Sequence, residues 1–261
     1  MALPDCGEPC AASVFDAPFA MAFQPIVNAC AGRIYAYEAL VRGPKGQPAM
    51  TVLEQVNAAN RHAFDQDCRV KAIETAAKLG LPRGDALLSI NFLPNAVSEP
   101  MACIRSTVAA AKDAALPLDR VIFEFSEGEP VEYGRLCHIL AAYKTLGLKT
   151  AIDDFGAGYS GLTLLTRFQP DLVKLDMELI RDIDTSKVKQ VLVSAMLKAC
   201  AEIGVEVVAE GIETKAESAT LRGMGLDLQQ GFLFARPGLE TLPKPAWPRR
   251  AAHAAAGAIA A

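Results

Sequence analysis

Two adjacent aspartates, Asp153 and Asp154, follow a short apolar run and precede a glycine-rich stretch in residues 151–162, AIDDFGAGYSGL. The apolar run at 148–152 predicts a buried strand. Two carboxylates at its end are costly unless a positive charge lies beside them. A divalent metal would supply that charge, and oxygen-rich carboxylate sites suit Mg²⁺ or Mn²⁺. The structural alternative is a helix start at which an aspartate accepts hydrogen bonds from backbone N–H groups.

Other polar residues interrupt or follow apolar runs where further strands are predicted to end. They are Glu38, Asn91, Glu124, Lys174, Glu210 and Gln230. In an α/β barrel the carboxyl ends of the strands meet at one end, which carries the active site. One such residue is usually a buried polar group with a structural partner, but seven successive strands that deliver one favour a functional site.

The residue types suit hydrolysis of a phosphodiester by two metal ions. Four side chains offer hard oxygen ligands for one ion: Glu38, Asn91, Glu124 and Asp153. Asp154 could reach a second ion about 4 Å away, and such a pair can activate water and hold the attacking and leaving oxygens. Lys174 would neutralise phosphate charge or orient the water, and Glu210 would take the water's proton or bind the second metal. The three histidines lie in helical or tail stretches, so neither a Ser-His-Asp triad nor a Cys–His pair is predicted.

The elements that must position these side chains alternate along the chain. Strands are predicted at 21–27 and 34–41, and their short connection makes them antiparallel neighbours. Six more strands are predicted at 86–91, 121–125, 149–153, 172–175, 206–209 and 228–233. Helices are predicted at 51–60, 64–79, 101–115, 132–146, 161–167, 186–203 and 215–224. This alternation predicts an α/β fold, a TIM-like (β/α)8 barrel with an antiparallel first strand, and leaves an open doubly wound sheet as the alternative.

Composition excludes several classes of protein. The 261 residues carry a formal net charge of −4, so we expect no binding to DNA or RNA polymers, and a phosphate-bearing ligand needs a local site. No apolar run approaches the roughly 18 residues of a membrane-spanning helix, and the N-terminus lacks the features of a secretory signal. The seven cysteines are an odd number and indicate reduced thiols. We therefore expect a cytoplasmic protein with no membrane insertion.

Three regions are predicted from these patterns. Residues 1–18 form an N-terminal extension, in which Cys6 and Cys10 leave a thiol pair or metal clip open as an alternative to a simple tail. Residues 19–240 form the barrel domain, and residues 241–261 an alanine-rich C-terminal tail. The extension is too short for a folded sensor. The sequence leaves open whether the chain is one piece of a longer protein.

Eight motifs occur along residues 23–237: FQPIV at 23–27, EALVR at 38–42, LSIN at 88–91, EFSE at 124–127, DDFGAGYSGL at 153–162, KLD at 174–176, AEGIET at 209–214 and QGFLFARP at 230–237. In this order they resemble the EAL-domain family, which are bacterial cyclic di-GMP phosphodiesterases. The resemblance implies hydrolysis of cyclic di-GMP to linear pGpG, two Mg²⁺ or Mn²⁺ ions in the active form, and a homodimer. It places the EAL domain at residues 19–240.

The resemblance also implies roles for individual residues. The metal ligands would be Glu38, Asn91, Glu124, Asp153 and Asp154. Lys174 would contact the attacking water or the phosphate, and Glu210 would be the general base. The dinucleotide site would be lined by Gln24, Leu40 and Arg42, of which Arg42 suits a phosphate. The supporting polar residues would be Glu127, Asp176, Glu213 and Gln230, with Glu127 steadying the loop at 154–162.

Some departures and alternatives remain. Ala157 and Gly161 stand where the family commonly has threonine and serine, but neither removes a ligand or a charge, so we expect an active enzyme. The alternatives are a non-catalytic cyclic di-GMP receptor that acts through a protein partner, and a scaffold that binds no nucleotide. Nearby aromatic and apolar residues are expected to pack in the loop or the core: Phe155, Tyr159, Phe232, Leu233 and Phe234.

Overall fold

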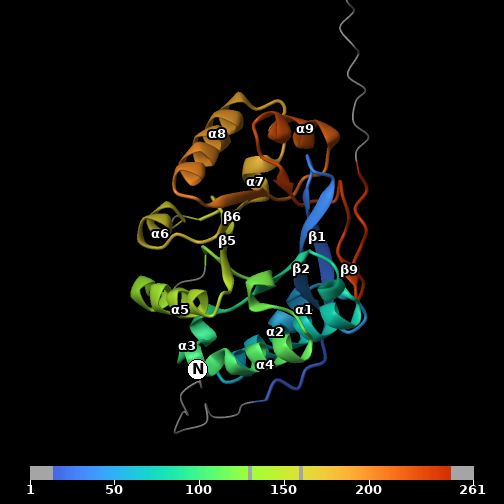
Figure 1. The fold of residues 1–261 in the computed structure, drawn as a ribbon, viewed down its shortest axis with the longest axis vertical. Helices are drawn as coiled ribbons and strands as arrows, with labels where there is room; N and C mark the ends of the chain where they lie inside the picture. The colour runs from blue at the N-terminus through green and yellow to red at the C-terminus, as the bar shows by residue number, and fades with distance from the viewer. Residues whose placement is uncertain (1–13, 129–130, 159–160, 248–261) are drawn as a thin grey trace, which may run out of the picture.

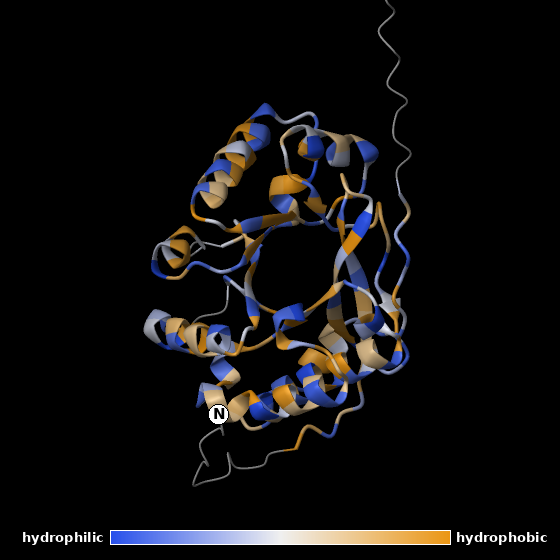
Figure 2. Ribbon diagram, viewed as in Figure 1, coloured by the Kyte–Doolittle hydropathy of each residue, from blue (hydrophilic) through white to orange (hydrophobic). Residues whose placement is uncertain are grey.

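The structure is a computed structural model that describes residues 14–128, 131–158 and 161–247. Strands form a closed ring at its centre, and helices surround most of the ring (Figure 1). Apolar residues are concentrated on the strands and on the helix faces that cover them (Figure 2). Predictions for Cys6, Cys10, Tyr159 and the alanine-rich run after residue 247 fall outside the described residues.

The barrel contains the eight predicted strands. They are β1 (Ala20–Asn28), β2 (Arg33–Arg42), β3 (Leu87–Asn91), β4 (Val121–Ser126), β5 (Lys149–Phe155), β6 (Leu172–Leu175), β7 (Glu206–Ala209) and β8 (Leu228–Gln229). Neighbours from β2 to β8 pair in parallel, and β1 closes the ring by pairing antiparallel with both β2 and β8. The predicted barrel with an antiparallel first strand is therefore confirmed.

Helices cover the outer face of the barrel. They are α1 (Met50–Leu53), α2 (Arg61–Lys78), α3 (Pro100–Cys103), α4 (Arg105–Asp113), α5 (Tyr133–Thr145), α6 (Gly161–Arg167), α7 (Met177–Ile180), α8 (Lys187–Glu202) and α9 (Lys215–Gly223). A capping box between Thr214 and Glu217 begins α9. Outward-facing aromatic residues of the strands pack against the helices, as in the contact of Phe123 with Tyr143 of α5.

Three predicted elements differ from the structure by more than a few residues or are divided. The helix expected at 51–60 ends as α1 at Leu53, because the side chains of Asn57 and Asn60 accept hydrogen bonds from nearby backbone N–H groups and close turns instead. The helix expected at 101–115 is divided into α3 and α4 at Ile104. The last strand, expected at 228–233, ends at Gln229, where the chain turns around Gly231.

The segments on either side of the barrel also pack against it. Phe15, which lies in the predicted extension, is buried, and its ring contacts Phe64 of α2 at a centroid distance of 4.8 Å. A short strand that was not predicted, β9 (Gly238–Leu239), pairs with β1. The hydroxyl of Tyr37 donates to the carbonyl of Pro243 at 3.0 Å. Among the described residues, no helix combines the length and apolar character needed to cross a membrane.

Candidate active site

The inner face of the barrel carries two layers of side chains. The lower layer is apolar and consists of Ile26, Ala36, Ile122, Ala151, Leu172, Val208 and Leu228. In the parallel strands, the residue two positions further on is polar in six cases: Glu38, Glu124, Asp153, Lys174, Glu210 and Gln230. Since side chains two residues apart lie on the same face of a strand, these residues form a second layer toward the carboxyl end. In the antiparallel β1 the order is reversed, and Gln24 precedes Ile26.

Lys174 lies at the centre of the polar layer. Its Nζ atom lies 2.7 Å from Glu210, 3.0 Å from both Glu124 and Asp153, and 3.6 Å from Glu38. We call these five residues the lysine–carboxylate cluster. The side chains of Lys174 and Glu124 are each only 1% exposed. Four carboxylates therefore share one ammonium group, which leaves an excess of buried negative charge.

The pKa values of the cluster reflect this imbalance. Burial raises the pKa of Glu124 to about 8, although the Lys174 ammonium opposes the shift. Burial also raises the pKa of Glu210 well above its usual value. For Lys174, burial disfavours the charged form, but the surrounding carboxylates outweigh it and hold its pKa well above the ordinary value. The lysine therefore stays protonated, and the carboxylates compete for its charge.

The carboxylates form two overlapping groups that could hold metal ions. One group comprises Glu38, Glu124 and Asp153, and the other comprises Asp153, Asp154 and Glu210; in each, ligand oxygens lie within 4.8 Å of one another. Asp153 belongs to both groups, and its Oδ1 lies 3.0 Å from Lys174 Nζ. Carboxylate oxygens of this kind fit a hard divalent cation, and a shared aspartate fits two adjacent ions.

Backbone conformation and neighbouring groups orient the other two predicted ligands. Asp154 has a φ of +54°, a left-handed conformation uncommon outside glycine, and accepts a hydrogen bond from Ser126 Oγ at 3.1 Å. Burial, with the adjacent Asp153 charge, raises its pKa. Asn91 lies at the end of β3 beside the first group, and its Nδ2 donates to Glu38 Oε1 at 3.3 Å.

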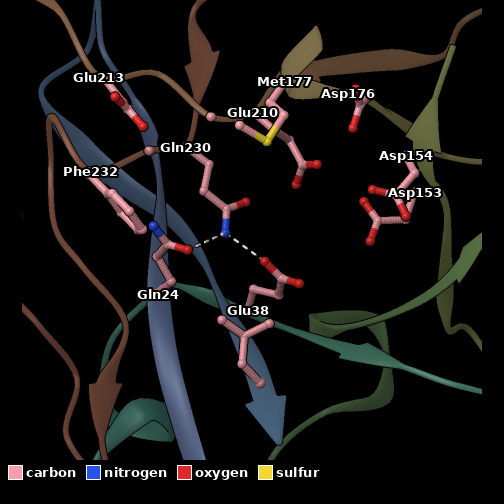
Figure 3. A pocket seen from close by; sticks show the side chains of 13 residues that line it. Gln24, Glu38, Asp153, Asp154, Asp176, Met177, Glu210, Glu213, Gln230 and Phe232 are labelled. Atoms are coloured by element: carbon pink, nitrogen blue, oxygen red, sulfur yellow. Dashed lines mark hydrogen bonds between the residues drawn. The ribbon is translucent and has the colours of Figure 1, made fainter. Parts of the chain in front are cut away.

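A pocket opens above the cluster (Figure 3). Nine of the predicted site residues line it: Gln24, Glu38, Leu40, Asp153, Asp154, Asp176, Glu210, Glu213 and Gln230. Gln230 Nε2 donates to Glu38 Oε2 at 2.5 Å and to Gln24 Oε1 at 3.3 Å, so these amides hold one wall of the pocket. Gln24 in turn donates to the carbonyl of Ala235 at 3.0 Å, which ties the segment after β8 to β1.

Four other predicted residues lie beside or below this pocket. Glu124 and Lys174 lie beneath its floor, where both are buried. Arg42 and Asn91 line an adjoining, mostly apolar pocket together with Leu40, and Arg42 Nη1 donates to the carbonyl of Val41.

Two pocket-lining acids also have structural partners. Asp176 accepts from the N–H of Glu178 at the start of α7, and Glu213 pairs with Arg181 at 2.9 Å. Both acids therefore have local partners even though they line the pocket.

Glu127 lies away from the cluster, under the loop that follows the two aspartates. Its Oε1 atom accepts a hydrogen bond from the N–H of Gly158. At Gly161, a Cβ atom would lie 2.2 Å from Glu127 Oε2 and 2.7 Å from the Phe155 ring, so a serine there would require both to shift. Glycine at position 161 is thus explained by the close packing of Glu127 beneath this loop.

Several residues of the site were not predicted or were predicted to lie elsewhere. Ser89 Oγ donates to Glu124 Oε1, and its place two residues before Asn91 is a signal that the sequence does contain. Met177 and Phe232 both line the pocket. The prediction that Phe232 is a core residue is wrong, because it is 46% exposed, whereas Phe155 and Phe234 are buried as expected. No pattern in the sequence distinguishes the exposed Phe232 from the buried Phe234.

Comparisons with known proteins agree with this site. The family model described as "EAL domain" matches residues 15–237. The chain is 35% identical over 231 residues to the blue light- and temperature-regulated antirepressor BluF of Escherichia coli, covering 88% of this chain and 57% of that protein. It is 30% identical over 228 residues to the cyclic di-GMP phosphodiesterase PA2567 of Pseudomonas aeruginosa, covering 85% of this chain and 38% of that protein. The chain thus spans less than two thirds of these curated relatives.

Two solved structures resemble this chain in fold and sequence. A standalone versatile EAL protein from Vibrio cholerae O395, in its c-di-GMP bound form, matches with a TM-score of 0.85 and 50% identity, covering 88% of this chain and 97% of that one. The manganese and cyclic di-GMP complex of Klebsiella pneumoniae BlrP1 at pH 6 matches with a TM-score of 0.83 and 39% identity, covering 89% of this chain and 59% of that one.

Proposed function

Because the chain belongs to the EAL-domain family, we propose that it is a divalent-metal-dependent phosphodiesterase that hydrolyses cyclic di-GMP to linear pGpG. The observation that carries the proposal is the lysine–carboxylate cluster, in which four carboxylates surround one ammonium at the carboxyl end of the barrel. Such an excess of buried negative charge is costly in a protein that binds no cation. The named phosphodiesterase among the relatives and the c-di-GMP bound structural neighbour support the same substrate.

The donor set fits two Mg²⁺ or Mn²⁺ ions. Four residues would hold the first ion: Glu38, Asn91, Glu124 and Asp153. Asp153 and Asp154 would hold the second, since Asp153 belongs to both groups of ligands. When bound, the ions would activate a water molecule and stabilise charge on the phosphate oxygens. The manganese complex of BlrP1 supports a centre of this kind.

Lys174 and Glu210 would act on the reacting groups. The ammonium of Lys174 is buried, permanently charged and fixed by its neighbours, so it would stabilise negative charge on the phosphate without first having to be oriented. Glu210 is bonded to this ammonium at 2.7 Å and faces the pocket. Its raised pKa makes its carboxylate a stronger base than that of an ordinary glutamate, which suits a group that takes a proton from the attacking water.

The pocket walls would hold the dinucleotide. Gln24 and Leu40 face the pocket above the cluster, and Arg42 lies beside it with a guanidinium group suited to bidentate phosphate binding. Gln230 would keep Glu38 in place through its hydrogen bond. Glu127 would steady the loop after Asp154. A homodimer and a cytoplasmic location belong to the same proposal.

The test is a chromatographic assay of the purified chain with cyclic di-GMP, with Mg²⁺ or Mn²⁺ present and then with EDTA added. We expect pGpG to appear only with metal, and we expect Glu38→Ala to remove both the activity and most of the metal binding. Glu206→Gln is the matched control, because this glutamate lies at the opposite end of the barrel, bonded to Tyr35. Metal-independent product, or full activity of Glu38→Ala, would refute the assignment.

The second candidate is a receptor that binds cyclic di-GMP and acts through a protein partner. Similarity to BluF, a protein named as an antirepressor, is the observation that favours it. All of the predicted metal ligands are present, which favours hydrolysis. Calorimetry separates the two candidates: tight binding of cyclic di-GMP without any pGpG in the presence of metal would support the receptor.

A further inference from the structure

We propose that Ser89 is a positioning residue, which holds Glu124 in the orientation that binds a divalent cation. The inference rests on the proposed function and deepens it by adding a side chain that acts through a metal ligand. Ser89 is 0% exposed, and its hydroxyl donates to Glu124 Oε1. Glu124 belongs to the first group of candidate ligands, together with Glu38 and Asp153.

The register of the sheet places the Ser89 hydroxyl at the level of the carboxylates. Ser89 pairs with Glu38 of β2, and Asn91, two residues further along β3, pairs with Glu124 of β4. Since residues two apart lie on the same face of a strand, Ser89 and Asn91 both face the interior of the barrel. The strand between β2 and β4 therefore contributes a hydroxyl to the layer in which both neighbours carry a glutamate.

Glu124 is held at both of its carboxylate oxygens. Oε1 accepts from the Ser89 hydroxyl, and Oε2 accepts from Lys174 Nζ at 3.0 Å. Two donors on different oxygens fix the plane of the carboxylate, and each oxygen keeps a lone pair that a metal ion could use. The Glu124 carboxylate is thus oriented before a cation arrives.

The two donors differ in charge, and this difference gives the hydroxyl its role. The Lys174 ammonium also lies 3.0 Å from Asp153 and 2.7 Å from Glu210, so Glu124 shares it with other carboxylates. Its positive charge also repels an approaching cation. The Ser89 hydroxyl is neutral, so it orients Glu124 without opposing the binding of a metal ion.

A purely structural role for Ser89 leads to a different expectation. If the hydroxyl served only to satisfy a buried carboxylate, its loss would lower the stability of the metal-free protein. Metal affinity would then stay unchanged or rise, because a cation would satisfy the same oxygen. A positioning role requires the opposite result, a lower affinity for the metal.

The test is calorimetric titration of the purified chain with Mn²⁺ alone. We expect Ser89→Ala to weaken Mn²⁺ binding about tenfold or more, the usual effect of removing a group that orients a metal ligand. Ser89→Cys keeps a similar size but has only a weak donor, so it should also lose affinity. Ser89→Thr keeps the hydroxyl and should bind within about threefold of the wild type. In each variant the Mn²⁺ concentration for half-maximal hydrolysis of cyclic di-GMP should shift in parallel.

Ser218→Ala is the matched control. Ser218 is 2% exposed, and its hydroxyl donates at 2.7 Å to the side chain of Gln229, outside the lysine–carboxylate cluster. This variant loses a buried hydroxyl of the same kind and should keep the Mn²⁺ affinity of the wild type. A loss of affinity in Ser218→Ala equal to that in Ser89→Ala would overturn the proposal, because any buried hydroxyl would then have the same effect.

The outcomes distinguish this inference from the proposed function. Wild-type Mn²⁺ affinity in Ser89→Ala or Ser89→Cys overturns the positioning role and leaves the proposed function standing. A loss in Ser89→Thr equal to that in Ser89→Ala also overturns it, because the hydroxyl alone would then be insufficient. A wild-type chain that binds Mn²⁺ without hydrolysing cyclic di-GMP overturns the proposed function, and the titrations still decide the role of Ser89. A wild-type chain that binds no Mn²⁺ overturns both.

Discussion

The pairing of polar side chains differs between the two ends of the barrel. At the amino end, two polar side chains have local partners: Tyr35 donates to Glu206 at 2.8 Å, and Asp171 accepts from the N–H and the hydroxyl of Thr150 at 2.8 and 3.0 Å. At the carboxyl end, four carboxylates share the single ammonium of Lys174. The first arrangement satisfies its own groups, and the second leaves negative charge for a ligand to neutralise.

This difference separates stability from function within one barrel. Paired polar groups at the amino end each contribute about 1 kcal/mol to the free energy of unfolding. Crowded carboxylates oppose folding until a cation binds, which is a common property of active sites. Substitutions at the carboxyl end should therefore change activity most, and substitutions at the amino end should change only stability.

The largest expected effect is at Asp153, which belongs to both metal groups. Asp153→Asn removes a charge shared by both groups, so we expect hydrolysis of cyclic di-GMP to fall below about one per cent of wild type, with weaker Mn²⁺ binding. Initial rates of pGpG formation and calorimetric Mn²⁺ titration measure the two effects. A variant with near wild-type rate and metal affinity would show that Asp153 is not a ligand.

The next largest effect is at Lys174. Lys174→Met keeps much of the side-chain volume but removes the only ammonium of the cluster, so we expect kcat to fall about a hundredfold while KM changes only a few-fold. The metal-free variant should also unfold more easily, because four carboxylates then lie together without a cation. Steady-state kinetics at saturating Mn²⁺ measure the split. A raised KM with unchanged kcat would assign the lysine to ground-state binding.

Much of the site was predictable because β-strands alternate their faces. Ile122 and Glu124, or Val208 and Glu210, lie two residues apart in runs that are otherwise apolar, so a polar layer above an apolar one follows from the sequence once the strands are recognised. The short first connection likewise predicted the antiparallel pairing of β1 with β2, which the structure confirms.

The rest depends on contacts between segments that are distant in sequence. Phe232 and Phe234 have the same residue type, and only the turn at Gly231, packed against Ile212, determines which of them is exposed. Glycine at 161 is explained by Glu127, 34 residues earlier, and not by its own neighbours in the chain. Local patterns could not predict where α1 ends, because Asn57 and Asn60 use their side chains to close turns in place of a helix.

A smaller effect, on stability and its pH dependence, tests the excess charge directly. Burial raises the pKa of Glu124 from 4.5 to about 8. Between these values the folded, metal-free protein keeps a proton that the unfolded chain has released. The free energy of unfolding should therefore fall as pH rises from about 5 to 8, by at most about 1.4 kcal/mol per pH unit from this group. Urea unfolding in EDTA at several pH values measures the slope.

The control for this pH dependence is Glu124→Gln, which has no carboxyl group to ionise and keeps a similar shape. Its slope between pH 5 and 8 should be flatter than that of the wild type, and saturating Mn²⁺ should stabilise the wild type more at pH 8 than at pH 5. Parallel slopes for the two proteins would show that the buried carboxyl ionises at an ordinary pKa.

The smallest expected effect is at the amino end, where Tyr35→Phe removes one hydroxyl and its bond to Glu206. We expect a loss of about 1 kcal/mol in the free energy of unfolding and no change in kcat or KM, because the pair lies at the far end of the barrel from the cluster. Urea unfolding and the pGpG assay on the same preparation measure both. An altered rate would mean that the two ends of the barrel are coupled, and the division between a stabilising end and a functional end would then be wrong.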